Sequence, residues 1–377
     1  MIRLRHTLWR GAVALVGVLM HGVVAREMAA QGATDAGAAV HWESYSFGDP
    51  VAAGLKRVSL RTVPLRVEFQ PVRWARVGIR SAFATGVVDR VDGTQNRISG
   101  LTDTELSVSL PLVEDRVMVA ASLMLPFGKS TFTPDEARVA GIIAADLLPF
   151  ALTHWGSGGS LDVSTQAAGT VGLLNVGARV GYQLSREFAL LEQGQFAYRP
   201  GGQLYARIAA DGNIGDSRMA AQLTAYTFGD DQRNSQNLYR TGNRVQGLLT
   251  YSMPAGRTGR AQVYVGALRR EHGTFADGSV DTPAQTMLLV GGGWRQPFAY
   301  GVLIPLVDVR LVSSNDGLGQ GYISDAGLTA ELPVFGGRAT LLPGLRARFG
   351  TLKVRAGVES GITGFDLSAT LRLGGAR

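Results

Sequence analysis

The 377-residue sequence contains no cysteine and no apolar segment long enough to cross a membrane as a helix. Without cysteine there are no disulfide bonds, no thiol catalysis and no cysteine-ligated metal. A helical span needs about 20 mostly apolar residues, so helical spans are not expected. Histidine is scarce as well: beyond the N-terminal segment only His41, His154 and His272 remain, and their spacing predicts neither a metal site nor a cofactor.

The N-terminal segment 1–33 has the features of a secretory signal peptide. Arg3, Arg5 and Arg10 precede an apolar run at 11–20, and small residues follow at 25–33, where we expect cleavage. The alternative is an N-terminal anchor helix. Residues 34–377 are then one domain. Three of the seven excess positive charges lie in the signal peptide, so the remainder is too weakly basic to predict nucleic-acid binding.

The rest of the chain repeats one pattern, in which apolar and polar residues alternate over about ten to fourteen positions. In the segment 366–373, Asp-Leu-Ser-Ala-Thr-Leu-Arg-Leu, every odd position is apolar and every even position is polar. Successive side chains of a β-strand point to opposite faces, so one face of this strand is entirely apolar. Strands of a soluble sandwich are usually about five or six residues long, whereas this length and period are typical of transmembrane barrel strands.

Sixteen such segments predict an all-β fold, a single transmembrane antiparallel up-and-down β-barrel with one helical extracellular loop; fourteen strands is the alternative. The predicted strands are 39–48, 55–69, 72–86, 99–113, 115–126, 158–168, 171–183, 202–212, 217–228, 241–254, 258–270, 283–296, 299–312, 321–334, 338–349 and 361–373. Connections are alternately short and long, as expected for periplasmic turns and extracellular loops. At Pro64 the alternation changes phase, which predicts a bulge or an edge position.

Parity within each strand separates side chains that face lipid from those that face the lumen. Val117, Val263, Val307 and Leu328 are among those assigned to lipid. A charge facing lipid at the midplane costs about 2–4 kcal/mol, so charged residues are assigned to the lumen. The lumen-lining candidates for solute contact are Arg76, Arg80, Glu105, Arg179, Arg207, Arg244, Asp308, Arg310, Arg346 and Arg348. Arginine exceeds carboxylate among all inward residues, which predicts an anion-preferring pore unless cross-strand ion pairs fill the barrel.

The longest predicted loop, 127–157, contains a helix signal. Thr133-Pro134-Asp135-Glu136 is a capping box with proline at the first helical position. Candidate gate residues on one face of the following helix are Val139, Ile142, Ile143 and Leu147. The loop either folds into the lumen as a constriction, covers the mouth as a lid, or lies on the membrane surface.

The end of the same loop contains residue types that an enzyme could use. Ser157 and Ser160 lie near His154 in sequence, the residue types that an outer-membrane lipase would use. No pattern supplies an orienting partner for such a pair, so we predict no catalytic residues and no enzyme.

The chain resembles a family of bacterial outer-membrane barrels loosely related to long-chain fatty-acid transporters and to barrels associated with aromatic-compound degradation. The matching segments are GLTDT at 100–104, LPFGK at 125–129, residues 133–148, YTFGDD at 226–231 and ITGF at 362–365. The resemblance covers roughly residues 45 to 373. It implies passive uptake of a small or hydrophobic solute.

The predicted function is therefore an outer-membrane channel or transporter for small solutes, hydrophobic or anionic, in the bacterial outer membrane. The alternative is a structural or surface-binding barrel whose lumen is filled by side chains. The partners predicted are outer-membrane lipid, the barrel-assembly machinery and the solute itself.

Overall fold

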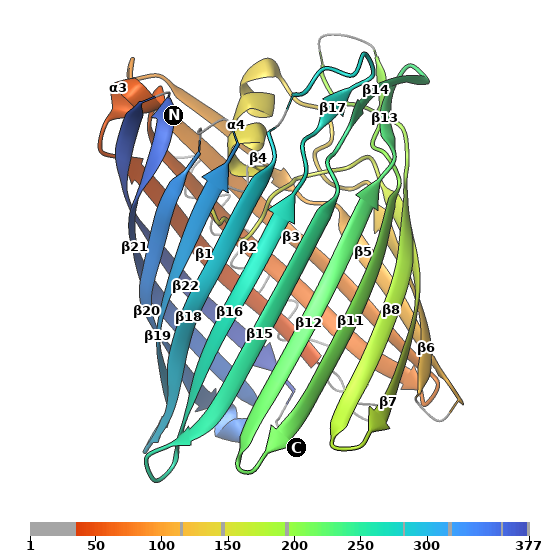
Figure 1. Ribbon diagram of the computed structural model, residues 1–377, viewed down its shortest axis with the longest axis vertical. Helices are drawn as coiled ribbons and strands as arrows, with labels where there is room; N and C mark the ends of the chain where they lie inside the picture. The colour runs from red at the N-terminus through yellow and green to blue at the C-terminus, as the bar shows by residue number, and fades with distance from the viewer. Residues whose placement is uncertain are drawn as a thin grey trace.

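The structure, a computed structural model, describes residues 35–113, 116–144, 148–192, 196–281, 283–315, 319–355 and 357–374. The predicted signal peptide 1–33 and the candidate gate residue Leu147 lie outside these ranges. Within them the chain forms a closed antiparallel β-barrel, whose strands run obliquely around a central space (Figure 1). No helix in the described ranges has the length and apolar character of a membrane span.

Sixteen strand positions make up the wall, which confirms the predicted number over the alternative of fourteen. The strands are β1 (Asp35–Phe47), β2 (Leu55–Val72), β3 (Ala75–Arg90), β4 (Gln95–Leu101), β5 (Thr104–Leu112), β6 (Val117–Leu125), β7 (Ser160–Val171), β8 (Leu174–Ser185), β11 (Gln203–Ile214), β12 (Ser217–Phe228), β15 (Arg244–Ala255), β16 (Gly259–Arg270), β18 (Gln285–Phe298), β19 (Gly301–Ser314), β20 (Gly321–Val334), β21 (Ala339–Arg355) and β22 (Val358–Leu373). The short β4 and β5 both pair with β3 and share one position in the wall. Pairing of β1 with β22 closes the barrel.

One end of the barrel carries tight turns and the other carries the long connections (Figure 1). Gly172, Gly215 and Gly256 turn the chain at the first end with positive φ angles. The long connections contain α3 (Pro50–Ala53), α4 (Pro134–Ala144) and a small sheet of β9 (Phe188–Ala189), β10 (Ala197–Arg199), β13 (Asp230–Arg233), β14 (Gln236–Arg240) and β17 (Thr274–Phe275). The 3-10 helix η2 (Phe335–Gly337) joins β20 to β21. Long loops are extracellular in barrels of this type.

The outer face carries the predicted apolar belt. Val263, Val307 and Leu328 are 48%, 61% and 47% exposed in the isolated barrel, although each is flanked by paired strands. Side chains this apolar and this exposed require a lipid environment. The protein is therefore a transmembrane β-barrel.

The predicted bulge or edge position at Pro64 is wrong. Pro64 pairs with Ala82 inside a register that runs without interruption between Arg57 and Phe69, and β2 has a partner on each side. The alternation changes phase because the strand crosses from one environment to another. Below this level its apolar side chains face lipid, whereas above it Val58 and Leu60 face inward and are fully buried.

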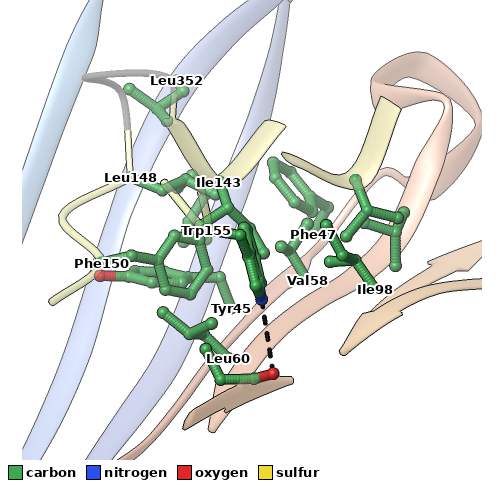
Figure 2. Packing of buried hydrophobic residues seen from close by; sticks show 14 of the residues in the cluster. Tyr45, Phe47, Val58, Leu60, Ile98, Ile143, Leu148, Phe150, Trp155 and Leu352 are labelled. Atoms are coloured by element: carbon green, nitrogen blue, oxygen red, sulfur yellow. Dashed lines mark hydrogen bonds between the residues drawn. The ribbon is translucent and has the colours of Figure 1, made fainter. Parts of the chain in front are cut away.

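These inward apolar residues belong to a hydrophobic core inside the barrel (Figure 2). Its wall side comes from β1–β4 and β20–β22, for example Tyr45 and Ile98, and its inner side from residues 132–155. Trp155 is 1% exposed and its indole Nε1 donates to the Ala84 carbonyl at 3.4 Å. The longest loop therefore folds into the barrel and packs on one side of the inner wall.

Candidate functional site

Inward-facing polar side chains line the lumen. All ten lumen candidates named from the sequence have inward parity in the observed strands. Their exposures differ: Arg76, Arg80 and Arg207 are exposed, Arg348 is buried, and the other six are partly buried. If side chains filled the lumen, they would bury the inward-facing residues. Inward side chains that stay exposed therefore border open space in the lumen.

Cross-strand ion pairs occupy part of this wall. Arg80 lies between Glu68, at 3.1 Å, and Glu105, at 3.8 Å. On β8, Arg179 lies 3.8 Å from Asp162 and donates to the Tyr205 hydroxyl at 3.0 Å. The predicted pairing that would neutralise the lumen is therefore present at these positions.

Other inward arginines have no such partner. Among the described residues no carboxylate lies within ion-pair distance of Arg76, Arg207, Arg310 or Arg346. The Nε of Arg207 donates to the Thr224 hydroxyl at 3.1 Å, which fixes its orientation without neutralising its charge. The accessible wall therefore keeps an excess of positive charge.

Arg348 has a different environment. Its guanidinium lies within 3.3 Å of carboxylate oxygens of Glu43, Asp325 and Asp366, and it donates to the Tyr45 hydroxyl at 2.6 Å. The side chains of Arg348 and Glu43 are 4% and 2% exposed. A buried arginine surrounded by carboxylates holds the wall together and is not accessible to a solute in this structure.

This buried charge cluster also contacts the longest loop. The Ala151 N–H donates to Glu43 Oε2 at 2.8 Å, and the Tyr45 hydroxyl donates to the Pro149 carbonyl at 3.5 Å. The Phe150 ring packs edge-on against Tyr45 with centroids 5.0 Å apart. The segment after α4 is therefore attached to β1 by both polar and apolar contacts.

The helix α4 begins with the predicted capping box. The Glu136 N–H donates to Thr133 Oγ1 at 3.3 Å, and the Thr133 N–H donates to Glu136 Oε2 at 3.1 Å. Partial burial opposes ionisation of Glu136, but hydrogen bonds from Lys129 and Thr133 outweigh it, and the pKa of Glu136 is lowered. The helix is thus fixed at its N-terminus.

The candidate gate residues face the wall and not the open lumen. Val139 and Ile143 are fully buried, and Ile142 packs against the same core from a partly buried position. Ile143 lies over Gly86 of β3, where an added Cβ would stand 2.5 Å from Ile143 Cδ1. Of the three placements open for this loop, the structure has the one inside the barrel, and these residues anchor it there.

Asp103 holds both ends of the inward-folded loop, a role that the sequence analysis missed. It lies between β4 and β5 and is 5% exposed. Its Oδ1 accepts from the Gly128 N–H at 3.1 Å, while Oδ2 accepts from Ser157 N–H at 2.7 Å and Oγ at 2.8 Å. The signal was present in the sequence, because GLTDT at 100–104 and LPFGK at 125–129 were both singled out, but only the fold brings Asp103 to Gly128.

The serines considered for catalysis have structural partners. Ser157 donates its hydroxyl proton to Asp103, and Ser160 Oγ accepts from Gln183 Nε2 at 3.0 Å. His154 Nδ1 lies 3.4 Å from the Thr153 hydroxyl. Within the described residues no group of His, Asp and Glu has the arrangement of a metal site.

No protein-family model and no curated protein matches the chain. Solved structures of bacterial outer-membrane proteins do. OpdK of Pseudomonas aeruginosa, solved with vanillate, has 12% identity and a TM-score of 0.49 over 91% of this chain and 99% of its own. A loop-deletion variant of OmpT from Vibrio cholerae has 10% identity and a TM-score of 0.45 over 90% and 99%. An outer-membrane channel of Pseudomonas putida F1 has 13% identity and a TM-score of 0.41 over 75% and 96%.

These likenesses concern the barrel architecture alone. The relationship to fatty-acid transporters and to barrels of aromatic-compound degradation stays a prediction.

Proposed function

We propose that the protein is an outer-membrane diffusion channel for small anionic solutes, narrowed at its extracellular side by the 127–157 loop. The observation that carries this proposal is a set of inward arginines, Arg207 above all, for which the described part of the chain supplies no carboxylate partner. Positive charge inside a low-dielectric wall concentrates anions and raises their rate of passage. A barrel of sixteen strands is also wide enough to keep an aqueous lumen.

The inward-folded loop defines which part of the lumen stays open. It covers the inner face of β1–β4 and β20–β22, including Arg348, and leaves the face that carries Arg179 and Arg207 uncovered. The solute path then follows the uncovered side. A hydrophobic solute would find charged side chains along this path, which is why an anion is the better candidate.

Planar-bilayer recordings of the purified barrel test the proposal. Wild type should show an ohmic open pore whose reversal potential in a salt gradient indicates anion preference. Arg207→Glu combined with Arg346→Glu should shift the reversal potential toward cations while the barrel still assembles. Arg233→Glu on the extracellular strand β13 is the matched control, since Arg233 is exposed outside the lumen. A closed barrel, or equal reversal potentials in all variants, would contradict the proposal.

A second candidate is a barrel whose extracellular loops bind a partner. A pocket of about 370 Å³ lies between the inward-folded loop and the β9–β10 connection. Phe188, Leu191 and Phe196 line it together with Glu187 and Glu192. This apolar pocket with carboxylates favours a cationic, partly apolar ligand, and binding of such a ligand without any conductance would support this second candidate.

A further inference from the structure

Three arginines lie on the outer wall just above the lipid belt, and the channel function does not involve them. Arg57 and Arg61 are on β2 and Arg97 is on β4, and all three have outward parity because their neighbours Val58, Leu60 and Ile98 are fully buried inside. Each of the three is exposed. We call them the outer-wall arginine patch.

The strand register brings the patch together. Arg61 is opposite Thr85 of β3, Arg57 is opposite Asp89, and Arg97 is opposite Val87, midway between the two. Two strand spacings and a two-residue offset give Cα separations of about 12 Å between Arg97 and each of the β2 arginines. Arginine side chains of this spacing can converge on one group above the wall.

The patch begins where the lipid belt ends. On β1, β2 and β4 the last outward apolar residues are Trp42, Val63 and Leu101, and polar residues follow them. On β3, Phe83 is followed outward by Thr85, by the partly buried Val87 at the level of Arg97, and by Asp89. Arg61 stacks on Trp42, with its Cζ 4.8 Å from the centroid of the ring. Tryptophan rings concentrate at the level of lipid headgroups, so the guanidinium lies at that level too.

The charge of the patch is largely uncompensated. Asp89 lies 3.6 Å from Arg57, but among the described residues no carboxylate lies within ion-pair distance of Arg61 or Arg97. The hydroxyls of Thr85 and Ser99, 2.8 Å apart, occupy the wall between these two arginines. Stacking on a ring leaves the edge of the Arg61 guanidinium, with its N–H donors, free for an anion.

We propose that the outer-wall arginine patch binds the phosphate of an outer-leaflet lipid. The site faces the membrane, so a lipid is the ligand that reaches it laterally with its tails against the belt and its headgroup at the level of Arg61 and Arg97. Guanidinium groups bind phosphate oxygens in pairs of charge-assisted hydrogen bonds. Of the two hydroxyls, which bond to each other, one keeps a free proton and adds a neutral donor. This site is separate from the lumen and does not depend on the barrel conducting.

The test uses the full-length barrel purified in a neutral detergent and native mass spectrometry to count bound lipids. The probes are dihexanoyl phosphatidic acid, dihexanoyl phosphatidylcholine with the same tails, and inorganic phosphate. Wild type should bind the phosphatidic acid at least ten times more tightly than the phosphatidylcholine. Arg61→Gln combined with Arg97→Gln should lose at least tenfold of that affinity, whereas Arg199→Gln combined with Arg233→Gln, which removes two exposed extracellular charges, should lose none.

Two outcomes overturn the proposal. The phosphatidic acid has an anionic phosphomonoester, whereas choline neutralises the phosphate of the phosphatidylcholine. Equal affinity of wild type for both lipids therefore excludes a site for an anionic phosphate headgroup, and this measurement needs no variant. Inorganic phosphate that competes as strongly as the lipid, at equal concentration, excludes a lipid as the source of the phosphate. Arg61→Lys combined with Arg97→Lys keeps the charge and should fold if the glutamine variant does not; it should bind with intermediate affinity, and wild-type affinity would contradict the guanidinium geometry.

Discussion

Removal of the Asp103 carboxylate should release the inward-folded loop. Asp103→Ala leaves three donors, Gly128 N–H and the N–H and Oγ–H of Ser157, without their acceptor. Hydrogen bonds to a charged acceptor contribute about 1.5–3 kcal/mol each. Water in the lumen can replace part of this loss once the loop moves, so we expect docking of the loop to weaken by about 2–4 kcal/mol.

The absence of native cysteine gives this prediction a clean reporter. Ile143, on α4 of the loop, is fully buried against the inner wall, so a cysteine at that position is protected from a charged maleimide while the loop is docked. A weakening of about 2–4 kcal/mol raises the population of the open loop, and with it the labelling rate, by about 30- to 1,000-fold. Asp135→Ala is the control, because Asp135 is 66% exposed and bonds only to exposed groups.

A second substitution tests the same contact from the other side. In Gly128→Ala the added Cβ would stand 2.4 Å from the Asp103 backbone nitrogen and 2.6 Å from the Trp155 carbonyl oxygen, neither of which can move alone. It should raise the labelling rate of Cys at position 143 as Asp103→Ala does. Gly169→Ala, with nothing within 4 Å of its Cβ, should not. If Asp103→Ala changes labelling by less than threefold, the carboxylate does not hold the loop and the reasoning is refuted.

Two further predictions concern the wall. Leu328→Arg should lower the folded fraction on heat-modifiability gels, because a lipid-facing charge near the midplane costs about 2–4 kcal/mol. Thr329 faces inward, so Thr329→Arg should assemble as wild type does. Equal damage by both substitutions would contradict the observed parity. Arg348→Gln should destabilise the barrel by about 3–5 kcal/mol in urea titrations, because it leaves buried carboxylates without their cation. Arg346 has no carboxylate at ion-pair distance among the described residues, so Arg346→Gln should destabilise the barrel far less.

The barrel could be predicted from sequence because its main constraint is local. Each strand must present apolar groups to lipid at every second residue, and this period can be counted without knowing any partner strand. Strand number, inward parity of the ten lumen candidates and the capping box of α4 were all predicted in this way and are confirmed. Boundaries shifted by a few residues where strands extend above the membrane, as β3 does to Arg90.

The candidate site was less predictable, because it depends on contacts between distant segments. Nothing in the local pattern separates Arg348 from Arg346, yet one is buried among carboxylates and the other faces the lumen. The difference comes from the loop, because Pro149 and Ala151 bond to Tyr45 and Glu43 beside Arg348, whereas Arg346 stays partly exposed. Asp103 was overlooked for the same reason, since its partners lie 25 and 54 residues away.

The phase change at Pro64 connects these two results. A strand that crosses a membrane and continues beyond it meets lipid outside at one level and water outside at the next. Its apolar side chains must therefore change faces, unless the lumen stays aqueous at both levels.

On β1–β4 and β20–β22 they do change, since Tyr45, Leu60 and Ile323 are buried inward. Apolar residues facing a lumen require a cover, so the inward-folded loop follows from the phase change itself. On β7–β16 most inward side chains near the rim are polar, for example Gln203 and Arg244. The inward apolar residues Phe228 and Leu268 are only partly buried there, so this side has no continuous apolar face to cover. The inward pattern of each strand thus predicts whether its side of the lumen is open or covered by the loop. The uncovered side, with Arg207, is therefore the expected path of the solute.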